Sequence, residues 1–300
     1  MSVVTIAPLQ LVGPAVATWG YWRRARTLSE RGAPVPAWRQ WCWYSGVALI
    51  VVTLSSPIAI ISDELFAIHM VEHLLIADLG ALLLVLGLTG PMLAPVLRVR
   101  ELRWLRALAH PAVALPLWAI DFYLWHLPAL YQATLTNDWV HALEHLLFLA
   151  CGMAIWMALL GPLPKPAWFG NLAKIVYIVL VRLIESVLAN VLLWSGTVLY
   201  PQYAAGERKW GVTALQDQTA AGAIMMIEGS IVTIVLFGWL FLRAAQESEE
   251  RDGLRELAAS HGVELDERRA ARAVAAGRGD ALRERILAQA GAEPPAPRAE

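Results

Sequence analysis

Long apolar runs constrain this chain more than any other feature of its sequence. A helix needs about 20 mostly apolar residues to cross the hydrocarbon core of a bilayer. Windows near that length fall at 3–22, 38–57, 65–88, 110–127, 139–160, 172–196 and 218–242. Only 16% of the 300 residues are charged, against about 25% in soluble domains. We therefore predict an all-α fold, a polytopic membrane protein with a bundle of seven transmembrane helices.

The charges between these windows predict the orientation of the bundle. Arginine and lysine gather after the first, third and fifth windows, whereas the alternate connections are acidic or mixed. Because basic loops stay in the cytoplasm, the N-terminus is predicted outside and the C-terminus inside. The first window has no basic residue ahead of it and three arginines after it, which favours a retained helix over a cleaved signal peptide.

The composition changes abruptly after Arg243. Residues 244–300 are rich in arginine, glutamate, aspartate and alanine, with almost no aromatic residues. We therefore predict two parts, a transmembrane domain over 1–243 and a charged cytoplasmic tail over 244–300. Segments 249–260 and 280–290 are expected to form short helices, and the proline-rich end is expected to be disordered. The charges of the chain are segregated, and no nucleic-acid partner is expected.

One motif, H-x-x-E-H, occurs near the start of two apolar windows. The copies are His69-Met70-Val71-Glu72-His73 and His141-Ala142-Leu143-Glu144-His145. On a helix, histidines four positions apart share one face. Both windows run from outside to inside, so the two copies are expected at matching depth. Two such helices side by side would direct four imidazoles and two carboxylates into one space.

Ionisable side chains are costly inside a bilayer and are normally functional there. The fourth window ends at its outer side in His126, which brings a fifth histidine to the same depth. The predicted metal ligands are therefore His69, His73, His126, His141 and His145. The residues expected to support them are Glu72, Glu144, Asp121, Asp217 and Met70.

Several chemistries fit this histidine cluster. Imidazoles with carboxylates suit copper, zinc, iron or nickel, while hydrogen-bonded core histidines or a proton relay would need no metal. H-x-x-E-H is also a zinc protease signature, in which the glutamate is the general base. One zinc needs only one copy and a third ligand, so the duplication argues against that interpretation. A b-type haem held by one histidine from each helix is a third option, which leaves two histidines unexplained.

Deeper in the membrane, the sixth window carries a second pair of charges. Arg182 and Glu185 are three positions apart, so they are predicted to pair on one helix face. Asp78, in the third window, is a further candidate partner for Arg182.

Four runs of residues resemble a known family. They are His69-x-x-x-His73, Leu124-Trp125-His126-Leu127-Pro128-Ala-Leu-Tyr131, His141-x-Leu-Glu-His145 with Leu147-Phe148, and Asp217-Gln218-x-x-Ala-Gly222. They look like the multi-pass CtaG family of assembly factors for caa-type cytochrome c oxidase. The resemblance covers about residues 45–243, outside which lie the first window and the charged tail.

The resemblance implies a multi-pass protein of the bacterial plasma membrane that matures a haem-copper oxidase through copper insertion. It implies no catalytic turnover, with a protease as the alternative. The implied partners are apo cytochrome c oxidase subunits, a copper donor and the lipid bilayer, and a homo-oligomer is left open. The positions carried over are His69, His73, His126, His141, His145 and Asp217.

Overall fold

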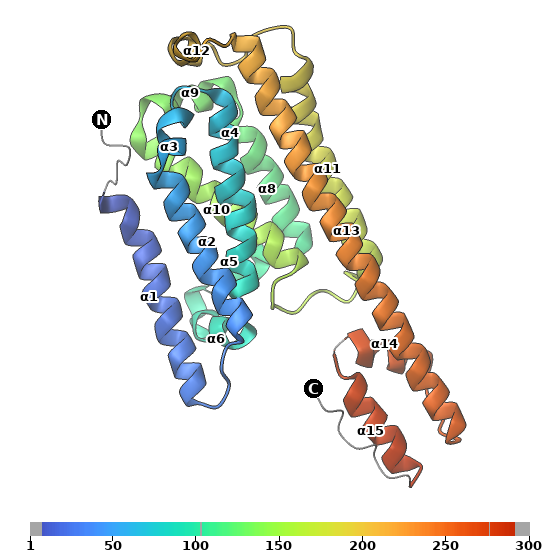
Figure 1. Cartoon of the computed structure of the whole chain (residues 1–300). Coiled ribbons are helices and arrows are strands. Elements are labelled where there is room, and N and C mark those ends of the chain that lie inside the picture. The colour runs from blue at the N-terminus through green and yellow to red at the C-terminus, as the bar shows by residue number, and fades with distance from the viewer. Residues whose placement is uncertain (1–7, 103, 276, 292–300) are drawn as a thin grey trace. The chain divides into compact units, whose positions relative to one another are not determined.

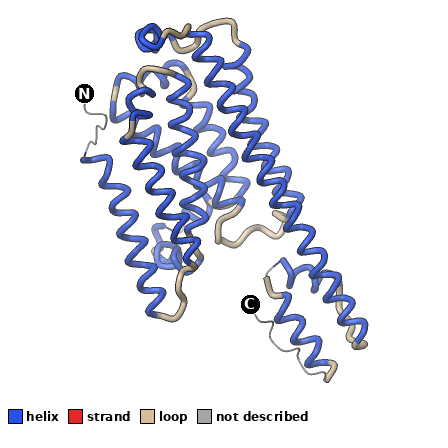
Figure 2. The backbone as a smooth tube through the Cα atoms, viewed as in Figure 1, coloured by secondary structure: helices blue, strands red, loops and turns tan. Residues whose placement is uncertain are grey.

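The computed structural model describes residues 8–102, 104–275 and 277–291. Its regular elements are all helices, and no strand occurs in these ranges (Figure 2). The chain divides into two compact units, Met1–Thr233 and Ile234–Glu300. The all-α prediction is therefore confirmed for the described part of the chain.

A helix lies in each of the seven predicted windows. The helices are α1 (Pro8–Glu30), α2 (Ala37–Ser55), the segment Phe66–Gly87, α8 (Pro111–Trp125), α10 (Asp138–Leu159), α11 (Asn171–Trp194) and α13 (Ala214–Ser260). Residues 3–7 of the first window lie outside the described residues. Figure 1 shows α2, α8 and α10 running alongside the two α-helices of the third window, α4 (Phe66–Leu74) and α5 (Ala81–Gly87).

Not all of these helices meet the requirements for crossing a bilayer. Among the described residues, four helices are long and apolar enough: Phe66–Gly87, α10, α11 and α13. A fifth span results if Arg100–Leu108 and α8, which meet at a bend of 79°, cross together. The last turns of α1 carry arginines and a glutamate, and α8 has only 15 residues. The described residues thus contain four to five candidate spans, and the count of seven and the orientation stay predictions.

The third predicted span is not a regular α-helix. It consists of α4 (Phe66–Leu74), a π-helix η1 (Leu75–Gly80) and α5 (Ala81–Gly87). π-Helical turns are rare and occur mostly at functional sites. Here the π-helix begins two residues after His73, so the irregularity directly follows the first H-x-x-E-H motif.

Helix α10 packs closely against this broken span. It contacts η1, α5, α8 and α9 (Pro128–Thr136). At Gly152 the two backbones approach so closely that an added Cβ would overlap the carbonyl group of Ala77. The missing side chain at residue 152 therefore allows α10 to lie directly on the segment that carries His69 and His73.

A connection between α11 and α13 packs against the start of α4. It contains a short 3-10 helix η3 (Pro201–Tyr203) and α12 (Ala204–Trp210). The Glu64 carboxylate, just before α4, accepts hydrogen bonds from Lys209 Nζ at 2.5 Å and Trp210 Nε1 at 2.6 Å. A Cβ at Gly206 would overlap the backbone of Glu64, so glycine permits this close approach.

The second unit is a small helical bundle. It comprises the end of α13, α14 (Glu267–Ala275) and α15 (Gly279–Gln289), joined by an apolar cluster of Leu254, Ala258, Val274, Leu282 and Ile286. Helix α13 passes residue 243 without a break. Helices occur in both predicted tail segments, while residues 292–300 lie outside the described residues. The domain boundary at 243 and the cytoplasmic location of the tail stay predictions.

Candidate metal site

The two H-x-x-E-H motifs face each other across α4 and α10. The ring centroids of His69 and His141 lie 5.3 Å apart, and those of His73 and His145 lie 5.4 Å apart. Within each motif the two rings are 4.3 and 4.4 Å apart, because residues four apart share a helix face. The four imidazoles therefore form one cluster, as the spacing predicts.

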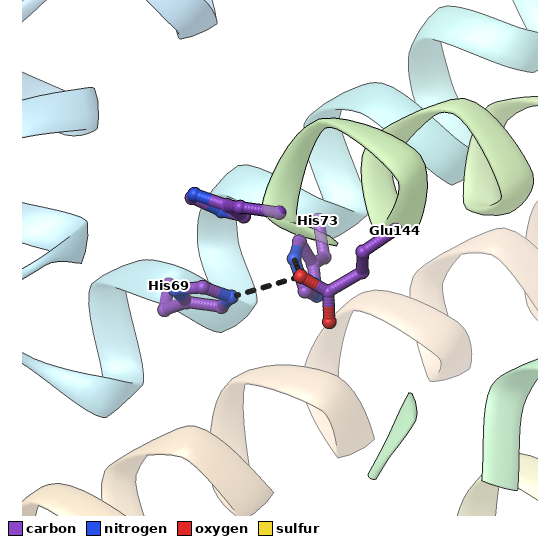
Figure 3. Close-up of side chains that lie close together, drawn as sticks. His69, His73 and Glu144 are labelled. Carbon is purple, nitrogen blue, oxygen red and sulfur yellow. Dashed lines mark ion pairs between the residues drawn. The ribbon is translucent and has the colours of Figure 1, made fainter. Parts of the chain in front are cut away.

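Glu144 joins this cluster from α10. Its Oε2 atom lies 3.6 Å from His73 Nε2 and 3.9 Å from His69 Nε2, and its side chain is fully buried (Figure 3). The glutamate of the second motif thus faces the histidines of the first. Both distances are too long for a hydrogen bond. Ligand atoms around a tetrahedral metal ion with bonds near 2.0 Å lie about 3.3 Å apart, so this spacing suits coordination with a small adjustment.

The potential ligand atoms fall into two overlapping sets. In the first, one atom each of His69, His73, His141 and Glu144 lie within 4.8 Å of one another. In the second, one atom each of Glu72, His141 and His145 satisfy the same distance. His141 belongs to both sets. Glu72 is 2% exposed, so both glutamates of the repeated motif are buried beside imidazoles.

The polar atoms of the cluster have few partners. Both ring nitrogens of His69 and His73, Nε2 of His141 and His145, and both oxygens of Glu144 are buried without a hydrogen bond among the described residues. More than about 90% of buried polar groups in proteins are paired, and leaving one unpaired costs about 1–3 kcal/mol. So many unpaired nitrogens in one place are typical of a ligand site and fit a metal ion that accepts imidazole.

His126 lies apart from the two ligand sets. It follows α8, where its Nδ1 donates to the Phe122 carbonyl oxygen at 2.7 Å in one tautomer, which leaves Nε2 buried and unpaired. The centroid of the Phe148 ring lies 4.7 Å from that of the His73 ring and 6.1 Å from that of the His126 ring. The described residues thus bring four of the five predicted ligands together, and His126 stands beside them with an aromatic ring in contact.

Two predicted supporting residues, Asp121 and Asp217, have other hydrogen-bond partners, and a third, Met70, is buried. Asp121 accepts a hydrogen bond from Trp125 Nε1 at 3.0 Å. Met70 is buried at 2% exposure. Asp217 accepts hydrogen bonds from the backbone N–H groups of Phe66, at 2.7 Å, and Ala67, at 3.0 Å. Asp217 therefore caps the N-terminus of α4, where a carboxylate also interacts favourably with the helix dipole.

Aromatic side chains that were not predicted from the sequence border the cluster. The Tyr131 ring lies 5.2 Å from His69, and its hydroxyl shares a 2.5 Å hydrogen bond with that of Tyr203. Tyr200 donates from its hydroxyl to the His126 carbonyl oxygen at 2.7 Å. Tyr131 belongs to a run that carries the family resemblance, but Tyr200 and Tyr203 lie in a connection without periodicity. Sequence alone offered no signal for these two.

The connection that carries Tyr200 and Tyr203 is joined to the start of α4 by a charged contact. The hydrogen bonds from Lys209 and Trp210 hold the pKa of the Glu64 carboxyl below its usual value. This contact and the Asp217 cap both act on residues 64–67. The position of the helix that bears His69 and His73 therefore depends on the last part of the first unit.

Comparison with known proteins identifies a family. A family model described as cytochrome c oxidase caa3 assembly factor (Caa3_CtaG) matches residues 19–247. This match covers all the residues of the histidine cluster. No solved structure matches the chain.

Similar relatives occur among mycobacteria. An uncharacterized protein of Mycobacterium bovis is 27% identical over 240 residues, which cover 68% of this chain and 36% of the relative. An uncharacterized protein of Mycobacterium leprae is 24% identical over 240 residues, covering 74% of this chain and 36% of the relative. The chain thus spans about a third of the length of the curated relatives it matches.

Proposed function

The chain belongs to the family of cytochrome c oxidase caa3 assembly factors, and from this we propose that it supports oxidase assembly by binding copper as cargo. The copper would be held by His69, His73, His141 and His145 with Glu144, and then passed to an apo oxidase subunit. His126 would be a neighbouring ligand during entry or release. A copper donor on the outer side of the membrane would load the site.

The unpaired imidazole nitrogens are the observation that carries this proposal. Imidazole suits copper among the transition metals, and a neutral nitrogen donor must keep its lone pair free to bind. The two nearby glutamates supply acceptors that orient imidazole N–H groups or bind directly. Four convergent imidazoles with so few hydrogen bonds support a cargo site better than a structural core.

Two alternatives remain as outcomes of the test. An intramembrane zinc protease would use one H-x-x-E-H motif, with its glutamate activating water. A b-type haem protein would use one histidine from each side of a porphyrin. The His69 and His141 rings are stacked at 5.3 Å, with their planes 16° apart, and this direct ring contact favours a compact ion over a macrocycle.

Metal analysis of the purified protein tests the proposal. The full chain is purified in detergent, loaded with copper under reducing, anaerobic conditions, and examined by elemental analysis and absorption spectroscopy. We expect bound copper in the wild type and a loss of more than half of it in a His73→Ala, His145→Ala double variant. His110→Ala is the matched control, since His110 lies outside the cluster and accepts a hydrogen bond from Ala112 N at 3.3 Å.

Each other outcome contradicts the copper proposal in a distinct way. Retention of zinc alone, together with loss of a peptidase activity in Glu144→Gln, would identify the protease. A Soret band lost with the histidines would identify a haem protein. Equal copper in the double variant and the wild type would exclude this cluster as the copper site.

A cellular assay separates metal binding from oxidase assembly. In cells that lack the protein, the double variant and the wild type are each expressed, and the copper content of the purified oxidase is measured. We expect restoration by the wild type and by His110→Ala, but not by the double variant. An oxidase fully loaded with copper in cells expressing the double variant would disprove delivery through this cluster.

A further inference from the structure

A second group of ionisable side chains lies apart from the histidine cluster. It consists of Asp78 in η1, Arg182 and Glu185 in α11, and Glu228 in α13. Glu228 is the one charged residue between Asp217 and Arg243, and Asp78 is the one between His73 and Arg98. These groups therefore lie in apolar stretches of three candidate spans, where uncompensated charge is costly.

Arg182 is the only cation of this group. Its N–H groups bond to residues of α13 and lie near Glu185. Its guanidinium donates to the Met226 carbonyl oxygen at 2.7 Å and to Ser230 Oγ at 3.0 Å. Its other terminal nitrogen lies 3.7 Å from Glu185, which confirms the pair predicted from their spacing. A Cβ at Gly229 would overlap the guanidinium, so the missing side chain permits this arrangement. Arg182 is thus engaged by Glu185 and by the Met226 carbonyl and Ser230 hydroxyl groups of α13.

Asp78 and Glu228 are each other's neighbours. Their carboxyl groups lie in hydrogen-bonding contact, while an additional hydrogen bond links Asp78 to Trp156. Both oxygens of Glu228 are shielded from solvent, and neither receives a hydrogen bond from an N–H or O–H donor of the described residues. Two carboxylates repel each other because both are negatively charged, and they cannot form a hydrogen bond because each offers only acceptors. A hydrogen bond between them requires one proton on one of the two groups.

The balance of charge also requires a proton on one of these carboxyl groups. Three carboxyl groups face one guanidinium, so full ionisation would leave two negative charges without a partner in an apolar segment. A desolvated carboxylate without a counter-charge takes up a proton instead of remaining ionised. The Arg182–Glu185 pair is neutral as a whole, which leaves Asp78 and Glu228 to share the remaining charge.

We propose that Asp78 and Glu228 form a proton-binding carboxyl pair in the membrane interior, separate from the histidine cluster. The bound proton lies between the two carboxyl groups, so the pair carries one negative charge with the proton present and two without it. Trp156 on α10 and the Arg182–Glu185 pair on α11 face this site. The proposal does not depend on copper, since no metal ligand takes part.

A hydrophobic carbodiimide provides the first test, because it modifies protonated carboxyl groups in apolar surroundings. The full chain in liposomes is treated over a range of pH, and the adduct is located by peptide mass spectrometry. We expect one adduct on Asp78 or Glu228 that decreases as the pH rises. The isosteric variants Asp78→Asn and Glu228→Gln should lower the total adduct severalfold. Glu249→Gln, which changes an exposed carboxyl group of the second unit, should leave it unchanged.

Infrared spectroscopy covers the case in which the reagent does not reach the site. A protonated carboxylic acid has a carbonyl stretch separate from that of a carboxylate, and the band shifts in deuterated water. We expect this band in the wild type at neutral pH and a smaller band in the Asp78→Asn, Glu228→Gln double variant, in which any contribution of the buried Glu72 and Glu144 is retained. A wild type without the band and without the adduct at any pH would overturn the proposal. Protection of the pair by sodium ions at constant pH would overturn it in favour of a sodium site.

Discussion

His141 differs from the other histidines in its place among the potential metal ligands. It is the one residue that belongs to both sets of ligand atoms, whereas His126 belongs to neither and has one ring nitrogen hydrogen-bonded to the backbone. At the scale of single residues, the four clustered histidines are therefore not equivalent to the fifth. This difference gives a quantitative expectation for copper affinity.

We expect His141→Ala to weaken copper binding far more than His126→Ala. Removal of a residue that only supports the ligands costs about 10–100-fold in metal affinity, so His126→Ala should stay at or below that range and His141→Ala should exceed it. Competition titrations with a chelator of known copper affinity measure both. A loss for His126→Ala equal to that for His141→Ala would show that His126 is a full ligand.

The contact of Glu64 with Lys209 and Trp210 predicts a dependence of stability on pH. These hydrogen bonds lower the folded-state pKa of Glu64 below its unfolded value. The stabilisation is therefore present above the unfolded pKa and is lost as the pH falls through the folded pKa. We expect Glu64→Gln to lower the unfolding midpoint in denaturant at neutral pH and to differ less from the wild type on acidification. A constant difference at all pH values would contradict this origin.

Much of the residue-level prediction rested on spacing within a helix. His69 with His73, and His141 with His145, lie together because the helical repeat brings residues four apart to one face. The hydrogen bonds of Asp217 could not be predicted from spacing. Its partners, Phe66 and Ala67, are 151 and 150 positions away, and no local pattern identifies a cap supplied from so distant a helix.

At the scale of elements, the Asp217 carboxylate connects α13 to α4. Loss of a side-chain cap costs about 0.5–2 kcal/mol, so Asp217→Ala should destabilise the first turn of α4 by that amount. Hydrogen exchange at the Phe66 and Ala67 amides is expected to accelerate accordingly. Asp138→Ala, which changes an exposed acidic residue in the first turn of α10, is the control that should leave these amides unchanged. Equal protection in Asp217→Ala and the wild type would contradict the cap.

The close contact between α10 and η1 predicts that a larger side chain at residue 152 is harmful. Gly152→Ala would force the two backbones apart, because the new Cβ overlaps the Ala77 carbonyl. Such overpacking costs about 1–3 kcal/mol, and it would also separate the two pairs of histidines. We expect lower stability together with weaker copper binding. Gly20→Ala, where nothing lies within 4 Å of an added Cβ, should change neither property. Unchanged copper affinity in Gly152→Ala would show that the spacing of α4 and α10 is not critical.

At the scale of the whole molecule, the apolar windows predicted where the long helices lie. The composition and length of an apolar window determine whether it forms a long helix, and each of the seven windows contains a helix. The π-helix η1 was not predicted, because a change from α to π hydrogen bonding leaves no compositional sign. The short helices α9 and α12 were also missed, since they lie in connections whose residues show no sustained periodicity.

Orientation is the prediction that concerns the molecule as a whole. The distribution of arginine and lysine predicts the N-terminus outside and the C-terminus in the cytoplasm. Alkaline phosphatase, active only outside the cytoplasm, and green fluorescent protein, fluorescent only inside, are fused separately to each end. We expect phosphatase activity at the N-terminus and fluorescence at the C-terminus. Fluorescence at both ends would require an even number of spans.

The cap on α4 has a consequence for the order in which the molecule is made. Asp217 is added to the growing chain 151 residues after Phe66, which at about 5–20 residues per second takes roughly 8–30 s. Throughout this interval, His69 and His73 are already synthesised on a helix whose first amides have no cap. Each new molecule therefore completes its histidine site only after the ribosome has translated most of the first unit.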